Sequence, residues 1–110
     1  MAQEIEIIRF RDLSNLPQAN CVVWCGCTAV DDDKQNMQTY LIKAGLIERG
    51  TTLTNIYKIG DNVKGDDGRS DILLRFSKPI SNEKVCGLIP DMITLANFLQ
   101  LYSQDYGSRP

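Results

Sequence analysis

Short apolar stretches alternate with polar ones along this chain, and their internal spacing separates strands from helices. Residues 4–10 alternate imperfectly and contain three isoleucines, which predicts a strand that tends toward a sheet edge. Residues 11–17 combine Asp, Ser, Asn and Pro and predict a turn or one helical turn. Residues 20–27 carry no charge and are β-branched at their centre, so they predict a strand buried on both faces and central in the sheet.

A helix is predicted to follow that strand. Thr28 and Asp31 have the spacing of a capping box, and Asp32 and Asp33 extend the acidic first turn that the helix dipole favours. The apolar positions then recur at helical spacing and form one stripe: Met37, Tyr40, Leu41 and Ala44. Gly45 suits the end of this helix, because glycine readily adopts the backbone conformation found there.

Two further strands are predicted around a polar loop. Residues 51–59 are rich in Thr, Ile and Tyr, so strand, helix and strand follow each other as a βαβ unit with a parallel strand pair. Residues 60–70 are polar and contain three glycines, and they join that strand to residues 71–76 in a long hairpin.

The last third of the chain predicts a short turn and a long helix. A turn is expected from Ser81 or Asn82 through Cys86, and Pro90 suits the first turn of a final helix that ends near Gln104. Residues 1–110 are therefore predicted to form one α/β (α+β) domain in the order β-β-α-β-β-α. Its four-stranded mixed sheet carries two main helices. The pattern leaves open whether the two helices cover one face of the sheet or both.

Composition narrows the class of protein and its partners. Apolar residues make up 43% and charged residues 24% of the 110 residues, as in an ordinary globular domain. The net charge of -2 provides no excess of cations for phosphate groups, so broad nucleic-acid binding is not expected. No segment has the pattern of a signal peptide or the length to cross a bilayer, so no membrane association is expected. The four cysteines are expected to be reduced thiols, and the predicted location is cytoplasmic.

The sequence lacks the residues of most common catalytic sites. It contains no histidine, which removes the commonest general base, the Ser-His and Cys-His pairs and the His-containing zinc sites. Gly60 and Gly65 have the spacing of a phosphate-binding loop, but Asp66 and Asp67 stand where Lys and then Ser or Thr are required. The glycine fingerprint of dinucleotide-binding folds is missing as well. No catalytic residue, metal ligand or cofactor is therefore predicted.

The cysteines could still carry chemistry. Cys21, Cys25 and Cys27 share one parity, so on a strand they would project from one face and, with Cys86, could supply four thiolates. The short knuckle spacing of structural zinc sites is missing, and buried cysteine commonly packs as a small apolar group. Core packing is therefore preferred to a metal site or a reactive thiol. Cys27 is the best candidate for reactivity, because it lies nearest the predicted helix N-terminus.

The polar loop is the first candidate for recognition. It offers four carboxylates and two cations that could hold a hard cation or an anionic ligand: Asp61, Lys64, Asp66, Asp67, Arg69 and Asp71. The spacing does not match an EF-hand, and a solvated turn with local ion pairs is the simpler interpretation. Polar loops of this length on a compact scaffold are a usual place for binding residues, so this loop is predicted to contact a partner or ligand.

The final predicted helix is the second candidate. Its expected core stripe consists of Met92, Leu95, Ala96, Leu99 and Tyr102. Three further apolar residues fall on its other sides and form a candidate interface: Ile93, Phe98 and Leu101. A helix that is apolar almost all round is either sandwiched inside the fold or covered by a partner, and complete internal burial is the alternative to an interface.

These features favour binding over catalysis. The preferred hypothesis is a small non-enzymatic binding or regulatory protein that engages a macromolecular partner, either another protein or a second copy in a homodimer. It would use the final helix and the 60–70 loop. A small accessory or inhibitor protein of a bacterium or its mobile elements fits this description. The alternative is a small metal-dependent enzyme or nucleotide-sensing domain that uses Asp66, Asp67, Arg69 and Asp71.

Overall fold

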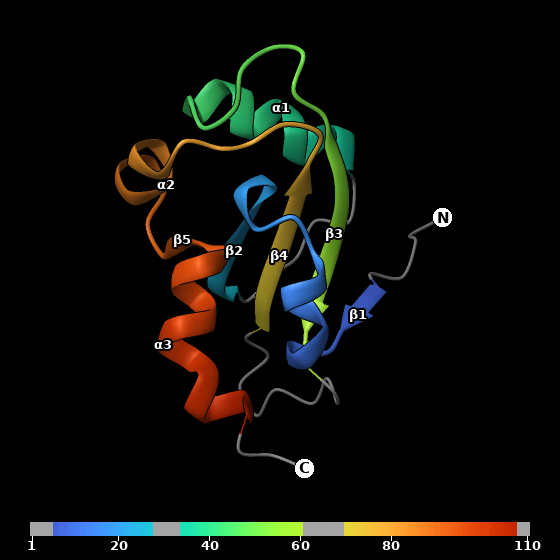
Figure 1. Ribbon diagram of the computed structural model, residues 1–110. Coiled ribbons are helices and arrows are strands. Elements are labelled where there is room, and N and C mark those ends of the chain that lie inside the picture. The colour runs from blue at the N-terminus through green and yellow to red at the C-terminus, as the bar shows by residue number, and fades with distance from the viewer. Residues whose placement is uncertain (1–5, 28–33, 61–69, 108–110) are drawn as a thin grey trace.

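The computed structural model describes residues 6–27, 34–60 and 70–107, and Figure 1 labels their helices and strands. In chain order these elements are β1 (Glu6–Ile8), the 3₁₀ helices η1 (Phe10–Asn15) and η2 (Gln18–Asn20), β2 (Cys21–Cys27), α1 (Lys34–Ala44), β3 (Leu53–Ile59), β4 (Ser70–Phe76), α2 (Asn82–Leu88), β5 (Met92–Thr94) and α3 (Leu95–Gly107). The predicted α+β class is confirmed.

The strands form one mixed sheet of five, in the order β1-β3-β4-β2-β5. Four strands were predicted from the sequence, and the additional one is β5. Its residues were expected to begin the last helix, but Pro90 and Asp91 lie in a turn, with Asp91 at a φ of 65°. Met92 to Thr94 then pair with β2, because the β-branched Ile93 and Thr94 favour extended backbone. The final helix consequently starts later, at Leu95.

The two strands of the predicted βαβ unit run in the same direction, as expected, but they are not neighbours in the sheet. β2 and β3 each run antiparallel to β4, so they point the same way, as expected. They are not neighbours, because β4 lies between them. The predicted β3–β4 hairpin does form, and the other edge of β4 then pairs with β2. The parallel neighbours are instead β1 and β3 at one edge of the sheet.

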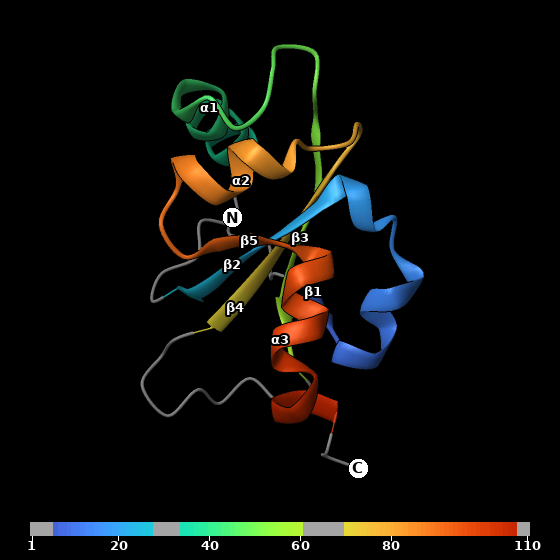
Figure 2. The same ribbon diagram turned by 60° about the vertical axis from the view of Figure 1, so that its left-hand side comes forward.

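The helices cover both faces of the sheet, which settles the point that the sequence left open (Figure 2). α1 and α2 pack on one face, whereas α3 and η1 pack on the other. Alternation along β2 divides its side chains between the two sides. Val22 and Trp24 contact the α1 and α2 side, and Cys21 and Val23 contact the α3 side.

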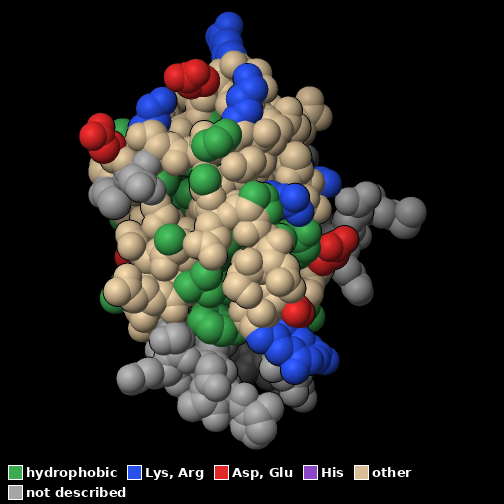
Figure 3. Space-filling view, viewed as in Figure 1, with side chains coloured by type: hydrophobic (Ala, Val, Ile, Leu, Met, Phe, Trp, Pro, Cys, Tyr) green, Lys and Arg blue, Asp and Glu red, His purple; other side chains and the backbone are tan. Residues whose placement is uncertain are grey.

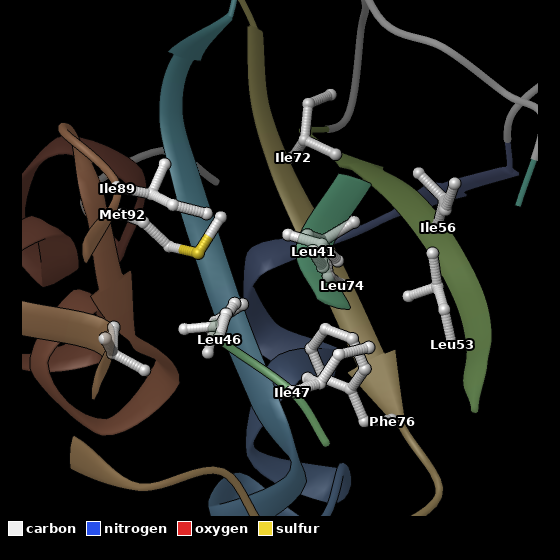
Figure 4. Packing of buried hydrophobic residues seen from close by; sticks show 12 residues of the cluster. Leu41, Leu46, Ile47, Leu53, Ile56, Ile72, Leu74, Phe76, Ile89 and Met92 are labelled. Atoms are coloured by element: carbon white, nitrogen blue, oxygen red, sulfur yellow. The ribbon is translucent and has the colours of Figure 1, made fainter. Parts of the chain in front are cut away.

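Two clusters of buried side chains hold these layers together. Figure 4 shows the larger one, where side chains from α1, the following loop and the strands converge: Val22, Leu41, Leu46, Ile47, Leu53, Ile56, Ile72, Leu74, Phe76, Val85, Ile89 and Met92. The smaller one lies beneath α3 and η1 and contains Leu13, Cys21, Val23, Ile59, Leu73, Leu95 and Phe98. Each square ångström of apolar area removed from water contributes about 25 cal/mol, so both layers depend on this burial.

Gly45 ends α1, as predicted. Its φ of 87° lies in the left-handed region, which glycine adopts at little cost. The backbone N–H of Leu46 donates a hydrogen bond to the carbonyl oxygen of Leu41 at 3.0 Å, which closes the last turn of the helix. The predicted capping box at the other end of α1, formed by Thr28 and Asp31, lies outside the described residues.

A side-chain cap marks the start of α3. The Oγ1 atom of Thr94 accepts a hydrogen bond from the backbone N–H of Asn97 at 3.2 Å, which satisfies one of the donors that a helix start leaves open. Thr94 is 8% exposed, so water competes little for this contact. The cap fixes the point where the chain leaves β5 and enters the helix. Among the described residues, no helix combines the length and apolar character needed to span a membrane.

Candidate interaction surface

The polar loop that the sequence selects falls mostly outside the described residues. This applies to Asp61, Lys64, Asp66, Asp67 and Arg69. Asp71 is described and lies in β4, opposite Ile59 of β3. The binding role of the loop stays a prediction.

Asp71 makes a structural contact at the end of β2. Its Oδ1 atom accepts a hydrogen bond from the backbone N–H of Gly26 at 3.0 Å. Gly26 has a φ of 68°, and β2 has one extra residue relative to β4 between Trp24 and Cys27. This is the pattern of a β-bulge with glycine in the left-handed conformation. The Asp71 carboxylate therefore supports the bulge that ends the regular pairing of β2.

Cys21 is a core residue. It is 2% exposed and belongs to the cluster beneath α3. Burial raises the pKa of its thiol from 9.0 to about 11, against a smaller opposing effect from the guanidinium of Arg75. Such a thiol is almost entirely protonated at neutral pH and is a poor nucleophile. The preference for core packing is confirmed for this residue.

The remaining cysteines are only partly described. Cys25 is partly buried against the same cluster as Cys21, so the predicted common face of these two residues is confirmed. The side chains of Cys27 and Cys86 lie outside the described set. Within the side chains that the structure places, no group of three or more His, Cys, Asp or Glu residues is arranged to hold a metal ion.

The structure separates the three residues predicted to form an interface. Ile93 lies in β5 and is partly buried against the cluster beneath α3. Phe98 is fully buried, so its predicted surface position is wrong. The reason is that η1 packs against the flank of α3 and brings the ring of Phe10 to 5.9 Å from that of Phe98, centroid to centroid. Leu101 alone of the three is exposed, at 68%.

The outer face of α3 is exposed and uncharged. Its described exposed side chains are Ala96, Asn97, Gln100 and Leu101, and we call these four residues the α3 outer face. The sequence contains no charged residue between Met92 and Gln104. Figure 3 shows the molecule in the view of Figure 1, with α3 at the lower left, and its charged side chains gather mainly at the upper end and the right-hand edge.

Other exposed apolar side chains are scattered over the remaining elements. Ile7 in β1 is 53% exposed, Leu88 in α2 is 46% exposed and Tyr40 in α1 is 44% exposed. Charged residues occur in the same short elements, for example Glu6 in β1 and Glu83 in α2. Leu101 is thus the most exposed large apolar side chain of the described residues, and it lies on the uncharged face.

Sequence reasoning missed an aromatic pair on the opposite side of the sheet. Tyr40 was assigned to the core stripe of α1, but its ring stacks on Trp24 of β2 with centroids 6.0 Å apart and planes at 22°. No local pattern reveals this contact, because it depends on how α1 packs across the sheet. The turn before β5 had a readable signal: Pro90 and Asp91 are turn residues, and the β-branched Ile93 and Thr94 follow them.

Comparisons of this chain with protein families, with curated proteins and with solved structures find no match. Function is therefore inferred from the residues and contacts described above.

Proposed function

We propose that this chain is a small non-enzymatic binding or regulatory protein that engages a macromolecular partner through the α3 outer face. The observation that carries the proposal is the exposure of Leu101, at 68%, within a stretch from Met92 to Gln104 that contains no charged residue. Depletion of charged residues is what distinguishes the core of a protein interface from the rest of a protein surface. The face therefore has the composition of an interface core.

Burial of Leu101 against a partner would contribute appreciably to the free energy of binding. Full burial of a leucine side chain contributes about 1.5–3 kcal/mol, so covering the exposed 68% of Leu101 would contribute about 1–2 kcal/mol. Asn97 lies four residues before Leu101 and Gln100 directly precedes Leu101, and both are exposed, so their amides can pair with polar groups of a partner. An apolar centre with polar neighbours is the usual composition of a contact surface.

The chemistry of the chain supports binding rather than catalysis. Histidine is absent from the sequence, and the buried thiol of Cys21 has a pKa raised to about 11. Asp71, which the alternative hypothesis places in a metal or nucleotide site, accepts a hydrogen bond from the backbone of Gly26. That contact gives Asp71 a structural role which needs no ligand.

A photo-crosslinking experiment tests the proposal. A benzoylphenylalanine residue replaces Leu101 in the full chain, and in a matched control it replaces Leu88, which is 46% exposed on α2. Irradiation in the cells that make the protein should give a discrete macromolecular adduct from position 101 and none of the same mass from position 88. Equal labelling from both positions, or no adduct from position 101, would contradict the proposal.

A thermal-shift screen separates binding from the enzymatic alternative. A ligand that binds only the folded state raises the melting temperature by mass action. The purified chain is expected to show no shift with divalent cations, nucleotides or the two together. A saturable rise with Mg²⁺ or Mn²⁺ that is abolished in a variant carrying Asp66→Asn and Asp67→Asn would instead support the metal-dependent alternative.

A further inference from the structure

Arg75 places a positive charge within the central part of the sheet. It lies in β4, between β3 and β2 (Figure 1), and its side chain is half-buried. Its partner in β2 is Cys21, which belongs to the cluster beneath α3. Burial raises the pKa of the Cys21 thiol, and the positive charge of Arg75 partly offsets that effect. Arg75 therefore lies close to Cys21, on the α3 side of the sheet.

The charge of Arg75 has no counterion in the described part of the chain. No described carboxylate forms an ion pair with its guanidinium, and no described group accepts a hydrogen bond from it. Glu6, in the edge strand β1, is aligned with Tyr57 rather than with Arg75. Moving a charge partly out of water costs free energy that a counterion would offset. A half-buried guanidinium in these surroundings is therefore suited to an anionic ligand.

Two neutral polar side chains of β3 flank Arg75. Asn55 lies directly opposite it, and Tyr57, two residues further along β3, packs against the cluster beneath α3. Side chains two residues apart on a strand share a face, so all three project from the same side of the sheet. Directly opposed Cβ atoms are about 4.5–5.5 Å apart, and diagonal neighbours are about 7–8 Å apart. The guanidinium, amide and hydroxyl groups can therefore reach one ligand.

The composition of this group favours a carboxylate. The amide of Asn55 and the hydroxyl of Tyr57 are half-buried donors that form no hydrogen bond with another described group. A carboxylate has one negative charge and two coplanar oxygens, which a guanidinium binds through two parallel N–H groups. A phosphate monoester carries a charge of about −1.5 to −2, which a single cation does not balance.

Lys58 provides a comparison on the other face of β3. It is half-buried as well, and the described residues provide no ion pair for it. Its register partners are Ile7 of β1 and Ile72 of β4, so no polar side chain lies directly opposite it. A carboxylate there would meet one flexible ammonium group and no neutral donor from those partners. Lys58 is therefore a matched control for Arg75.

We propose that Arg75, Asn55 and Tyr57 form a binding site for a carboxylate group. The guanidinium donates two hydrogen bonds to the carboxylate oxygens, and the amide and the hydroxyl donate to their remaining lone pairs. The site uses no residue of the α3 outer face, so it is independent of the proposed function. The carboxylate belongs to a free organic acid or to the C-terminus of a polypeptide, which present the same chemistry.

A titration followed by NMR tests the site. Backbone amide signals of the isotope-labelled full chain are followed as sodium acetate is added, with sodium chloride at equal ionic strength as the reference. Acetate should give saturable shifts in β3 and β4 around Arg75, and chloride should not. Arg75→Gln should weaken acetate binding at least about tenfold, and Tyr57→Phe about threefold. Lys58→Gln removes the same charge from the other face and should leave the dissociation constant within about twofold.

Several outcomes would overturn the proposal. Equal shifts with acetate and chloride would do so, as would acetate binding that Arg75→Gln leaves intact. An equal loss in Arg75→Gln and Lys58→Gln would reveal only a general effect of charge. If circular dichroism shows that Arg75→Gln is unfolded, a folded Tyr57→Phe variant decides, because unchanged binding contradicts the site and weakened binding supports it. Without binding, Arg75 simply keeps its guanidinium hydrated above a buried stem.

A second probe distinguishes the sources of the carboxylate. N-acetylglycylglycine represents a polypeptide C-terminus, and its C-terminal amide is the control. Tighter binding than acetate, lost on amidation, assigns the site to a chain terminus. Binding equal to that of acetate assigns it to a free acid. Either result supports a carboxylate site, and binding of neither probe overturns it.

Discussion

Replacing Phe98 with alanine should destabilise the domain strongly, and the structure allows the size of the effect to be worked out. Phe98 is fully buried and packs with Leu13 and Leu95 beneath α3. Its ring is also paired with that of Phe10. Truncation of a buried phenylalanine to alanine removes its transfer free energy and leaves a cavity, and together these cost about 3–5 kcal/mol. The ring pair lies within that total rather than adding to it, because the cavity includes its loss.

Leu101→Ala is the matched control on the same helix. Leu101 is 68% exposed, so its truncation removes little buried area and should change the free energy of unfolding by less than about 0.5 kcal/mol. Leu and Phe differ in helix propensity by less than about 0.7 kcal/mol, which is small beside the expected cost of Phe98→Ala. The difference between the variants therefore measures which side of α3 faces the core.

Urea unfolding followed by the fluorescence of Trp24, the one tryptophan of the chain, is a suitable assay. It should be run at a low protein concentration, where self-association contributes little to apparent stability. A domain of this size has a total stability of about 5–15 kcal/mol, so Phe98→Ala could unfold it completely. In that event Phe98→Leu, which keeps most of the apolar volume, should be folded and less stable than the wild type. A cost for Phe98→Ala below about 1 kcal/mol would refute the packing described here.

Three further predictions follow from individual contacts. Thr94→Ala removes the cap of α3 and should lower stability by about 1 kcal/mol in urea unfolding, while Thr94→Ser should retain most of it. A Cβ atom added at Gly26 would meet no atom within 4 Å, so the loss of stability expected for Gly26→Ala, about 1–2 kcal/mol, comes from the left-handed backbone alone. An unchanged free energy of unfolding would mean that the bulge relaxes freely. For Cys21, the folded pKa of about 11 exceeds the ordinary 9.0, so above pH 9 the unfolded chain loses its proton first and stability falls as pH rises. Cys21→Val should flatten that decline, and a decline of unchanged size would show that another group causes it.

Much of the fold could be predicted because its signals are local. The uncharged, β-branched run of residues 20–27 forms a strand, and Gly45 ends α1 with a φ of 87°. The position of β5 was missed because two local preferences compete there. Pro90 and Asp91 suit a helix start as well as a turn, and only pairing with Val22 to Trp24 decides in favour of a strand. Strand order is likewise non-local, which is why β4 between β2 and β3 was not foreseen.

The prediction of interface residues was limited in the same way, because the burial of a single side chain also depends on contacts that are distant in sequence. An apolar position on a helix can be assigned to a side, but which sides are covered depends on segments distant in sequence. Phe98 was assigned to a candidate interface because it falls off the expected core stripe of the helix. In the fold, η1 of the N-terminal segment does so through Phe10. Leu101, one turn further along, lies beyond the reach of that contact and stays exposed.

Because α3 buries one side and exposes the other, substitutions on this helix would separate the stability of the domain from the proposed binding. Leu95 and Phe98 hold the helix to the sheet, while Asn97, Gln100 and Leu101 face outward. If α3 binds as proposed, a substitution on the outer side changes association without removing core contacts. A substitution on the inner side changes folding without presenting a new surface. If one side of α3 served both purposes, any gain of charge on it would disturb both properties together. The absence of charge across this outer side is not required by the core, because lysine or glutamate at an exposed helix position costs little. The interaction proposed for these described positions would account for it.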